Sequence, residues 1–426
     1  MTSKFPVETQ RARRPQSPGL FLRVLAAFLA ASLSPSLAAA ASLTVTVSHD
    51  LAIARPAETI VIPWREVAQA LPGARLQHLA VRDAAGQSLP YQVTNVAPLV
   101  KDPQNLGVAY GELIFQHDFA AGEKSAGFTV EQTENVAPVF PTKAYGRYVQ
   151  ERLDDFAWEN DRIAHRIYGP ALAAAAAPGS GKEVLVTSGL DVWCKRVSYP
   201  IVDRWYNKGH DHYHTDEGEG MDLFSVGTGR GCGGTGVWDG TRLHVSRNYR
   251  SWRLLANGPV RVQFELTYDT WTTGGGIVSE VKRITLDAGH QLNEIESTFT
   301  VATGPQEITV GIGLNKNPAS PHQDPRIAVT SIPAAGSLAE WVVQKTHGEL
   351  GLTVIVPGPE FQGFATDELN QLVLARAVSG QPLRYLAGAG WSRAGEFTSQ
   401  EAWDNYVAAC AARTRAPVHV TLTTAP

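Results

Sequence analysis

A polar segment at residues 209–222 concentrates the side chains best suited to chemistry near neutral pH. His210, His212 and His214 are spaced two residues apart there, so an extended chain would place the three imidazoles on one face. Imidazoles beside carboxylates can hold a divalent metal, with His212 and His214 as the first candidates, or act as general base and acid. The spacing matches neither HExxH nor an EF-hand loop, and a solvated loop is the alternative.

A second polar segment, residues 152–170, mixes carboxylates and amides with arginines and aromatic rings. One interpretation is a surface network of ion pairs, each of which contributes little to stability. The other is a sugar-binding wall, in which Trp158 or Tyr168 stacks on a sugar ring while carboxylates and Asn160 bind its hydroxyls.

A third segment, residues 227–236, is rich in glycine and contains Cys232. The strand and helix that flank a phosphate-binding glycine loop are not evident around it, so a tight turn at the floor of a pocket fits better. The other cysteines are Cys194 and Cys410. An oxidising compartment would permit a disulfide between Cys194 and Cys232, and three buried free thiols are the alternative.

Residues 1–41 have the features of an export signal. Basic residues precede an apolar run at residues 20–33, and small residues follow it. The run is too short to span a bilayer comfortably, so we predict cleavage near Ala41 and a periplasmic or secreted mature protein without a membrane span. With 37 basic and 41 acidic residues, the chain also lacks the basic excess that nucleic-acid binding requires.

The elements expected to position the polar segments are mostly strands. Short alternating runs separated by turns predict a small β-sandwich over residues 42–140. Later alternation, as at residues 292–301 where Ile295 and Phe299 share one face, predicts a larger antiparallel sandwich over residues 141–426 that carries the site. The predicted fold class is therefore all-β, with few helices.

One helix is predicted near the C-terminus. Residues 398–401 can form a capping box, and Trp403, Tyr406, Val407 and Cys410 then fall on one face. That face should pack on a sheet.

A set of sequence blocks resembles one known bacterial family: residues 148–161, 168–170, 189–193, 199–200, 213–214, 218–222, 231–234 and 388–391. The family was long known as a domain of unknown function in polysaccharide-utilisation loci, and it includes oligosaccharide dehydratases of ulvan breakdown. The resemblance implies a sandwich like those of galactose mutarotases and polysaccharide lyases. It also implies an acidic oligosaccharide as substrate, whose non-reducing-end uronic acid loses water to become 4,5-unsaturated. Glu217 departs from the family pattern, which has histidine there.

Such an elimination needs three kinds of group. The proton at C5 is weakly acidic until the charge of the neighbouring carboxylate is offset by an arginine or by a divalent metal such as zinc or calcium. A base must take that proton, and an acid must protonate the leaving hydroxyl. We expect His214 as the base, Tyr206 or Tyr213 as the acid, and Arg166 or Arg196 on the carboxylate.

The remaining polar and aromatic residues of these blocks are expected to bind the sugar or to orient the histidine. They are Asp155, Glu159, Asn160, Asp161, Glu219 and Asp222, with Trp158 and Trp193 as stacking walls. This interpretation requires the stretches around Trp158, His214 and Cys232 to meet in one sugar-sized hollow.

Three other functions fit the same residues. A polysaccharide lyase would use the same deprotonation at C5 but split the chain, and an epimerase or mutarotase would form no unsaturated product. A non-catalytic binding protein for acidic glycans would leave the sugar unaltered. The sequence does not indicate the oligomeric state.

Overall fold

The computed structural model describes residues 42–94, 111–319 and 323–424. The expected export signal, residues 1–41, lies outside these ranges. The described strands form five sheets whose neighbouring strands run antiparallel, and the predicted all-β sandwich fold is confirmed. Among the described helices, none is long and apolar enough to cross a membrane.

Two small sheets near the N-terminus enclose a core of their own. In β1, Leu43, Val45 and Val47 are buried while Thr44 and Thr46 are exposed, as the alternation predicts. One sheet has the order β25-β1-β6-β3 and the other β2-β5-β4. Their elements are β1 (Ser42–Ser48), β2 (Arg55–Pro63), α1 (Trp64–Ala70), η1 (Leu76–His78), β3 (Leu79–Asp83), β4 (Tyr91–Thr94), β5 (Glu112–Phe119), β6 (Ser125–Gln132) and β25 (His419–Thr424).

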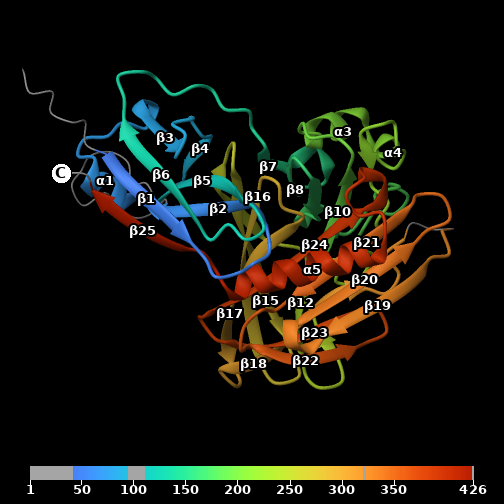
Figure 1. Cartoon of the computed structure of the whole chain (residues 1–426). Coiled ribbons are helices and arrows are strands. Elements are labelled where there is room, and N and C mark those ends of the chain that lie inside the picture. Colours follow the sequence, from blue (N-terminus) through green and yellow to red (C-terminus); the bar gives the residue numbers. More distant parts are fainter. Residues whose placement is uncertain (1–41, 95–110, 320–322, 425–426) are drawn as a thin grey trace, which may run out of the picture. The chain divides into compact units, whose positions relative to one another are not determined.

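The C-terminal strand returns to this N-terminal sandwich. β25 pairs with β1, from Leu43 opposite Thr424 to Ser48 opposite His419 (Figure 1). Alternation identifies a strand but not its partner, so the sequence could not reveal this pairing. The expected boundary near residue 140 stays a prediction, and the small sandwich takes one strand from the far end of the chain.

Two larger sheets enclose the main core. The eight-stranded core sheet has the order β14-β15-β16-β17-β24-β21-β20-β19, and the five-stranded core sheet has the order β13-β12-β18-β23-β22. In β17, Ile295, Phe299 and Val301 face the interior, as predicted. Their strands are β12 (Cys232–Trp238), β13 (Leu243–His244), β14 (Ser251–Asn257), β15 (Arg261–Thr272), β16 (Ile277–Asp287), β17 (Leu292–Thr303), β18 (Glu307–Asn315), β19 (Arg326–Ile332), β20 (Ser337–Val343), β21 (Glu349–Ile355), β22 (Phe361–Thr366), β23 (Asn370–Val378) and β24 (Pro382–Trp391), with η3 (Pro333–Ala335) and η4 (Ser392–Ala394).

Helix α5 (Gln400–Arg415) packs on β20 and β21 of the eight-stranded core sheet (Figure 1). Trp403 is fully buried, and a Cβ at Gly351 or Gly390 would overlap its ring. The N-cap is Ser399, whose hydroxyl accepts from the backbone N–H of Ala402 at 3.2 Å. The predicted helix is confirmed, and its cap lies one residue later than the expected box.

The glycine-rich segment begins with the expected turn, at Gly227 and Thr228, and continues as a strand. Residues from Cys232 onward form β12, and a Cβ at Gly233 would lie 2.4 Å from the Cβ of Ala387. Glycine there lets two sheets approach closely, and the missing side chains erased the alternation that would have revealed a strand. Residues 229–236 are buried in the interior instead of forming the floor of an open pocket.

A fifth sheet, called the site sheet here, has the order β11-β10-β9-β8-β7. All residues of its three central strands are buried, because the main core covers one face and short helices cover the other. Its elements are β7 (Ala144–Val149), η2 (Gln150–Arg152), β8 (Asp155–Asn160), β9 (Ile163–Ile167), α2 (Pro170–Ala173), β10 (Leu190–Lys195), α3 (Val202–Lys208), α4 (His210–Tyr213) and β11 (Gly220–Met221).

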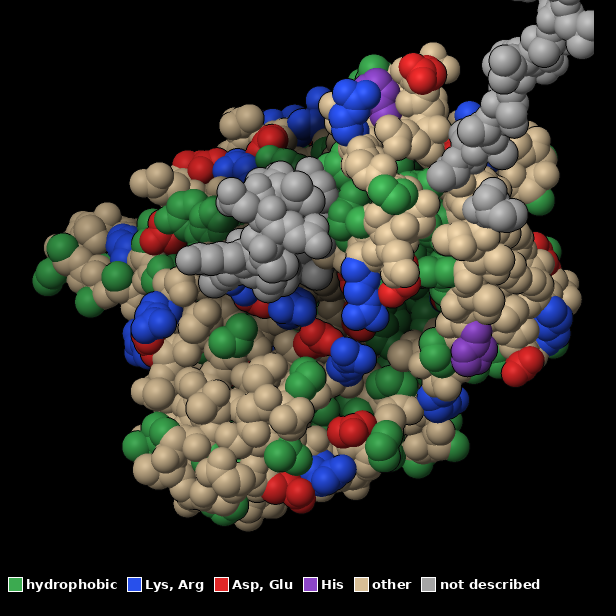
Figure 2. All heavy atoms as spheres, turned by 90° about the vertical axis from the view of Figure 1, so that its left-hand side faces the viewer, with side chains coloured by type: hydrophobic (Ala, Val, Ile, Leu, Met, Phe, Trp, Pro, Cys, Tyr) green, Lys and Arg blue, Asp and Glu red, His purple; other side chains and the backbone are tan. Residues whose placement is uncertain are grey.

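Charged side chains of both signs share the surface. On the face seen in Figure 2, Lys and Arg side chains are interspersed with Asp and Glu side chains. This mixture is what the near balance of 37 basic and 41 acidic residues leads one to expect. The face therefore presents ion pairs rather than one continuous basic area.

Candidate active site

The site sheet places polar side chains beneath helices α3 and α4. Ala157, Ala164 and Trp193 pack with α3 and α4 residues in one apolar cluster. Side chains alternate between the two faces of a strand, so residues two positions along from these three share that face. A buried polar network begins at those positions.

Arg166 is the centre of this network. Its Nε donates to Asp191 Oδ2 at 2.8 Å, and its Nη2 donates to Asp222 Oδ2 at 3.1 Å. Its Nη1 donates to the Tyr213 hydroxyl at 3.2 Å and lies 3.9 Å from Asp155 Oδ2. The residue is 4% exposed. These bonds hold the surrounding groups in place, so the geometry favours a positioning role over the expected contact with a substrate carboxylate.

Three buried carboxylates share this single guanidinium. Burial raises the pKa of Asp155 to about 6, and Arg166 opposes the shift. Burial and then the neighbouring Asp191 raise the pKa of Asp222 well above its usual range, with Arg166 again opposing. The network therefore holds protons at carboxyl groups much closer to neutral pH than free carboxylates do, which is a property of acid–base sites.

A strained turn precedes β8 and places its first carboxylate. Leu153 and Asp154 have φ values of 53° and 66°. Each such residue costs about 1–2 kcal/mol. The hydroxyls of Tyr148 and Tyr249 hold Asp154 in this conformation. A Cβ at Gly169 would lie 1.8 Å from the Asp154 carbonyl oxygen, so only glycine allows the chain after β9 to approach. Backbone strain of this kind is frequent at functional sites.

Glu159 anchors helix α3 instead of facing a ligand. Its carboxylate accepts from the backbone N–H groups of Ile201 and Val202 at 2.9 Å, and from Lys195 Nζ at 2.6 Å. A carboxylate at the start of a helix binds backbone N–H groups that have no partner within the helix. Glu159 thereby fixes the helix that carries Tyr206, whose hydroxyl donates to Asp155 Oδ2 at 3.2 Å.

Three other residues expected to bind sugar also bind the protein itself. Asn160 donates to two carbonyl oxygens of the turn after β16. Asp161 accepts from the backbone N–H of Gly289 at 2.7 Å. Glu219 accepts from Arg204 Nε at 2.8 Å and, like Glu159, ties α3 to the site sheet.

The two expected stacking tryptophans are core residues. Trp158 and Trp193 are 0% exposed, so neither presents a ring to a sugar. Trp158 stacks on His165 with ring centroids 5.3 Å apart, and Trp193 contacts Tyr213 at 4.9 Å. The expectation was wrong because it took the segment for an exposed wall, whereas the central strands of the site sheet are covered on both faces.

The histidine segment is helical at His210–Tyr213, so the single face that an extended chain would give the three imidazoles does not form. Gly209, with φ of 96°, ends α3, and the chain turns at once into α4. The buried Tyr213 holds this turn against the site sheet. Helical spacing separates the imidazoles: His212 is exposed and lies 3.1 Å from Glu217 Oε1, whereas His214 turns toward the network.

His214 is the point at which the network meets solvent. Its side chain is 37% exposed, and its Nδ1 lies 3.2 Å from the carbonyl oxygen of Asp222. A carbonyl oxygen only accepts, so a neutral ring bonded to it carries its proton on Nδ1 and leaves a bare lone pair on Nε2. Burial lowers the pKa of His214, which keeps the ring neutral at pH 7. A positioned neutral imidazole of this kind can act as a general base.

The residues of this region do not fit a metal ion. Within residues 42–94, 111–319 and 323–424, no three His, Cys, Asp or Glu side chains are grouped so that they could hold one. His212 and His214, the expected ligands, turn to separate partners, Glu217 and Asp222.

Arg196 lies apart from the buried network, at the surface, where it binds Asp216 of the polar segment that contains His214. Its side chain is 42% exposed, and its Nη1 donates to Asp216 Oδ2 at 2.9 Å. Arg393, from η4, reaches the same oxygen at 3.9 Å. Asp216 follows His214 by two residues, so two exposed guanidinium groups flank the histidine segment. Sequence reasoning missed Arg393, which is distant in the chain.

Sequence reasoning also left Asp191 out of the site, although it accepts from Arg166 and, at 2.7 Å, from the Tyr168 hydroxyl. Its signal was a carboxylate inside the apolar strand β10. The stretch around Cys232 joins the site only indirectly, through a backbone bridge between Gly231 and Leu190 of β10. All three cysteines are buried free thiols, which was one of the two expectations.

Comparisons with known proteins place the chain in a family. The model of the family described as a domain of unknown function, DUF4861, matches residues 47–420. The chain belongs to this family. It is also 28% identical over 389 residues to "Uncharacterized protein P7" of Formosa agariphila, which covers 89% of this chain and 93% of that protein.

Two solved structures from Enterococcus faecalis are distantly similar. One is an alpha-mannosidase, with a TM-score of 0.41, 8% identity and coverage of 90% of this chain. The other is a protein in the glycosyl hydrolase family 38, with a TM-score of 0.42, 11% identity and the same coverage. The chain spans 46% and 47% of their respective lengths, that is, about half of each.

Proposed function

We propose that this protein is an exported carbohydrate-active enzyme, a dehydratase that removes water across C4–C5 of a uronic acid at the non-reducing end of an oligosaccharide such as one derived from ulvan. The observation that carries the proposal is the half-exposed His214, whose Nδ1 is bonded and whose Nε2 is bare. The sequence blocks that resemble ulvan oligosaccharide dehydratases run through this residue and through the Arg166 network behind it.

In the proposed reaction, His214 Nε2 takes the proton from C5 of the uronate. The electron pair of the broken C5–H bond forms the C4–C5 double bond, and the bond from C4 to its hydroxyl breaks. The hydroxyl leaves as water with a proton from an acid. Base and acid catalysis each contribute about 10²–10⁴-fold to such reactions.

Tyr213 is the better candidate for the acid. Its hydroxyl accepts from Arg166 and also bonds to Arg152, both of which only donate, and no described side chain accepts its proton. The Tyr206 hydroxyl already donates to Asp155, and burial raises its pKa well above the usual range. The ring centroids of Tyr213 and His214 lie 4.8 Å apart, so acid and base are neighbours.

Arg196 is the better candidate for the substrate carboxylate. The Arg166 guanidinium is enclosed and already bonded to two carboxylates, whereas Arg196 is exposed beside the histidine segment. A guanidinium in that place would offset the charge that makes the C5 proton weakly acidic.

Product analysis tests the proposal. The protein is incubated with a panel of uronate oligosaccharides and followed by ultraviolet absorbance and mass. A dehydratase yields an absorbing product that has lost one water and is otherwise intact. A split chain would indicate a lyase, an unchanged mass with an altered sugar an epimerase or mutarotase, and an unaltered bound ligand a binding protein.

A matched pair of variants tests the base. His214→Ala should lower turnover by about 10²–10⁴-fold without changing the melting temperature, because the side chain is partly exposed. His212→Ala should keep its activity, since that imidazole contacts only the exposed Glu217. Full activity in the His214 variant would remove the base assignment.

A further inference from the structure

A hollow lies at one end of the main sandwich. It has a volume of about 330 Å³ and is lined by the end of β12, the turn between β15 and β16, and the turn between β17 and β18. This is at the lower end of the about 300–1,000 Å³ typical of small-molecule sites. Trp238 lies six residues along β12 from Cys232, about 20 Å at 3.3 Å per residue. Cys232 follows Gly231, the residue that is bridged to the site sheet. The Trp238 end of β12, where the hollow lies, is therefore far from the site sheet and separate from the His214 region.

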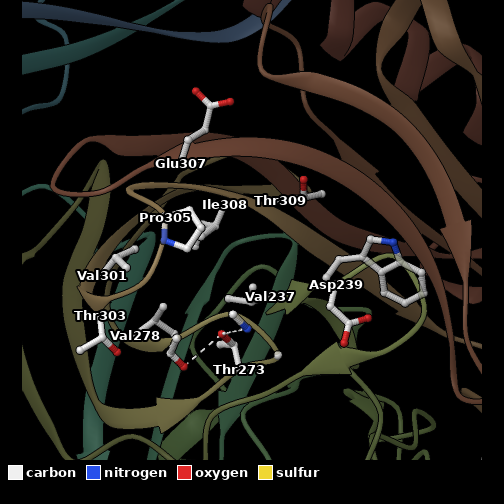
Figure 3. A pocket seen from close by; sticks show the side chains of 14 residues that line it. Val237, Asp239, Thr273, Val278, Val301, Thr303, Pro305, Glu307, Ile308 and Thr309 are labelled. Atoms are coloured by element: carbon white, nitrogen blue, oxygen red, sulfur yellow. Dashed lines mark hydrogen bonds between the residues drawn. The ribbon is translucent and has the colours of Figure 1, made fainter.

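The floor of the hollow is apolar. Val237, Val278 and Val301 are buried there and pack together as a small cluster with Ile308 at its margin. Figure 3 shows these side chains with Pro305 around the hollow. The half-buried indole of Trp238 adds an aromatic surface. Such a floor suits the C–H face of a ring.

The rim supplies separate donors and acceptors. The Thr303 hydroxyl accepts from the Ile277 N–H at 3.1 Å, which leaves its own proton to donate. The Thr309 hydroxyl donates to Gln362 at 3.1 Å, which leaves its lone pairs to accept. An apolar face below and hydroxyl partners above match the two sides of a pyranose.

The charge of the rim selects against an acidic ligand. Asp239 accepts from His244 and from the backbone N–H groups of Arg242 and Thr241, and these bonds hold its pKa well below the usual range. Among the lining residues, all of them described, there is no Lys or Arg. A carboxylate on the ligand would therefore meet two carboxylates of the rim, Asp239 and Glu307, with no Lys or Arg lining the hollow and the nearby Arg376 already paired with Glu307.

We propose that this hollow is a binding site for an uncharged pyranose unit of a glycan, separate from the His214 site. Four features define the ligand class. They are the apolar floor, the indole, the hydroxyl groups that can still donate or accept, and the lack of Lys and Arg in the lining. The inference does not depend on the reaction at His214, and it would allow the protein to hold neutral units of a chain whose acidic end is processed elsewhere.

Saturation-transfer NMR tests the site with cellotriose, mannotriose and xylotriose as neutral probes and trigalacturonate as the acidic one. We expect at least one neutral trisaccharide to bind and Trp238→Ala to weaken it about tenfold, while Trp238→Phe keeps most of the affinity. Trp252→Ala is the matched control, because that indole is 42% exposed but lies on β14, outside the hollow.

A second variant blocks the hollow without touching the indole. A Cβ on Gly275 would lie 3.9 Å from Cδ of Pro305 and meet nothing closer, so Gly275→Leu should fill the space and abolish binding. Activity on a short uronate oligosaccharide should be unchanged in both variants. The proposal is overturned if no neutral trisaccharide binds, if the folded variants bind like the wild type, or if trigalacturonate binds there as tightly as the neutral probes.

Discussion

This protein contains two buried networks of charged side chains. They differ in the balance of positive and negative charges and in whether they reach solvent. Lys282 Nζ bonds to Glu280 at 2.6 Å, to Ser297 at 2.8 Å and to the Tyr385 hydroxyl at 3.1 Å. That network has one cation and one anion and is sealed between the two core sheets. The Arg166 network has three carboxylates for two arginines, Arg166 and Arg152, and it ends at a half-exposed imidazole. A sealed, balanced network serves the fold, whereas an unbalanced one that reaches solvent has protons to exchange with a ligand.

The largest expected effect is a difference in the free energy of unfolding between variants of the two networks. Arg166→Met should lower the free energy of unfolding by about 3–5 kcal/mol, because it leaves the buried carboxylates of Asp191 and Asp222 without their bonded cation. Replacing both Lys282 and Glu280 by Met should cost less, since no buried charge is left unpaired. Urea denaturation at pH 7 measures both. An equal loss in the two proteins would show that the networks do not differ in this way.

A third region of the protein contains a buried carboxylate, that of Glu340, to which no cation is bonded. It can be compared with the carboxylates of the two networks. Glu340 on β20 is 1% exposed, both its oxygens lack a hydrogen-bond partner among the described residues, and burial raises its pKa to about 8. The folded protein then holds a proton that the unfolded chain releases above about pH 4.5, so stability falls as pH rises from there to about 8, by up to about 1.4 kcal/mol per unit.

Glu340→Gln should remove this loss. Its melting temperature should exceed that of the wild type by a margin that grows from pH 5 to pH 8, because the amide needs no proton to stay neutral. Glu368→Gln, at an exposed position, is the control and should follow the wild type. Parallel melting curves for Glu340→Gln and the wild type across this range would contradict the assignment.

A smaller effect tests whether α3 positions the site. Glu159→Gln should cost about 1–3 kcal/mol, because it weakens the anchor at the start of α3 and leaves Lys195 buried without its anion. In the folded protein, turnover should fall more than substrate affinity, since the helix carries Tyr206 and leads into His214. Turnover equal to that of the wild type would mean that the helix start does not set the site geometry.

The smallest expected effect lies far from both networks. Ser399→Ala removes the N-cap of α5 and should cost about 1 kcal/mol. Turnover on uronate oligosaccharides should not change, because α5 packs on β20 and β21 of the eight-stranded core sheet and carries none of the residues of the Arg166 network. Ser399→Asp should restore the stability. A loss of turnover would show that α5 is coupled to the site.

Much of the fold was readable from local pattern. Alternation identified β1 and β17, and the spacing of Trp403, Val407 and Cys410 identified α5. The glycine-rich strand β12 escaped because glycine has no side chain to alternate. Its partner contacts, such as Gly233 against Ala387, exist only once two sheets meet.

The sequence predicted which residues would form the candidate site, but it did not predict what each of them does there. Arg166, Asp155, Asp222, Tyr206, Tyr213 and His214 were singled out from the sequence and do come together in the structure. Nothing local could show that the residues between them, such as Trp158 and Glu159, would be covered on both faces. Burial of a residue depends on which distant elements pack over it.

The amino-acid sequence by itself determined the all-β class, the strands with regular alternation, the C-terminal helix and the group of residues that could do acid–base chemistry. These follow from interactions between residues close in the chain. The tertiary structure alone decided that β25 joins the N-terminal sheet, that Arg166 is enclosed by three carboxylates, and that His214 rather than His212 meets the network. Those outcomes depend on packing between distant segments, and packing sets burial, hydrogen-bond partners and hence which groups hold a proton.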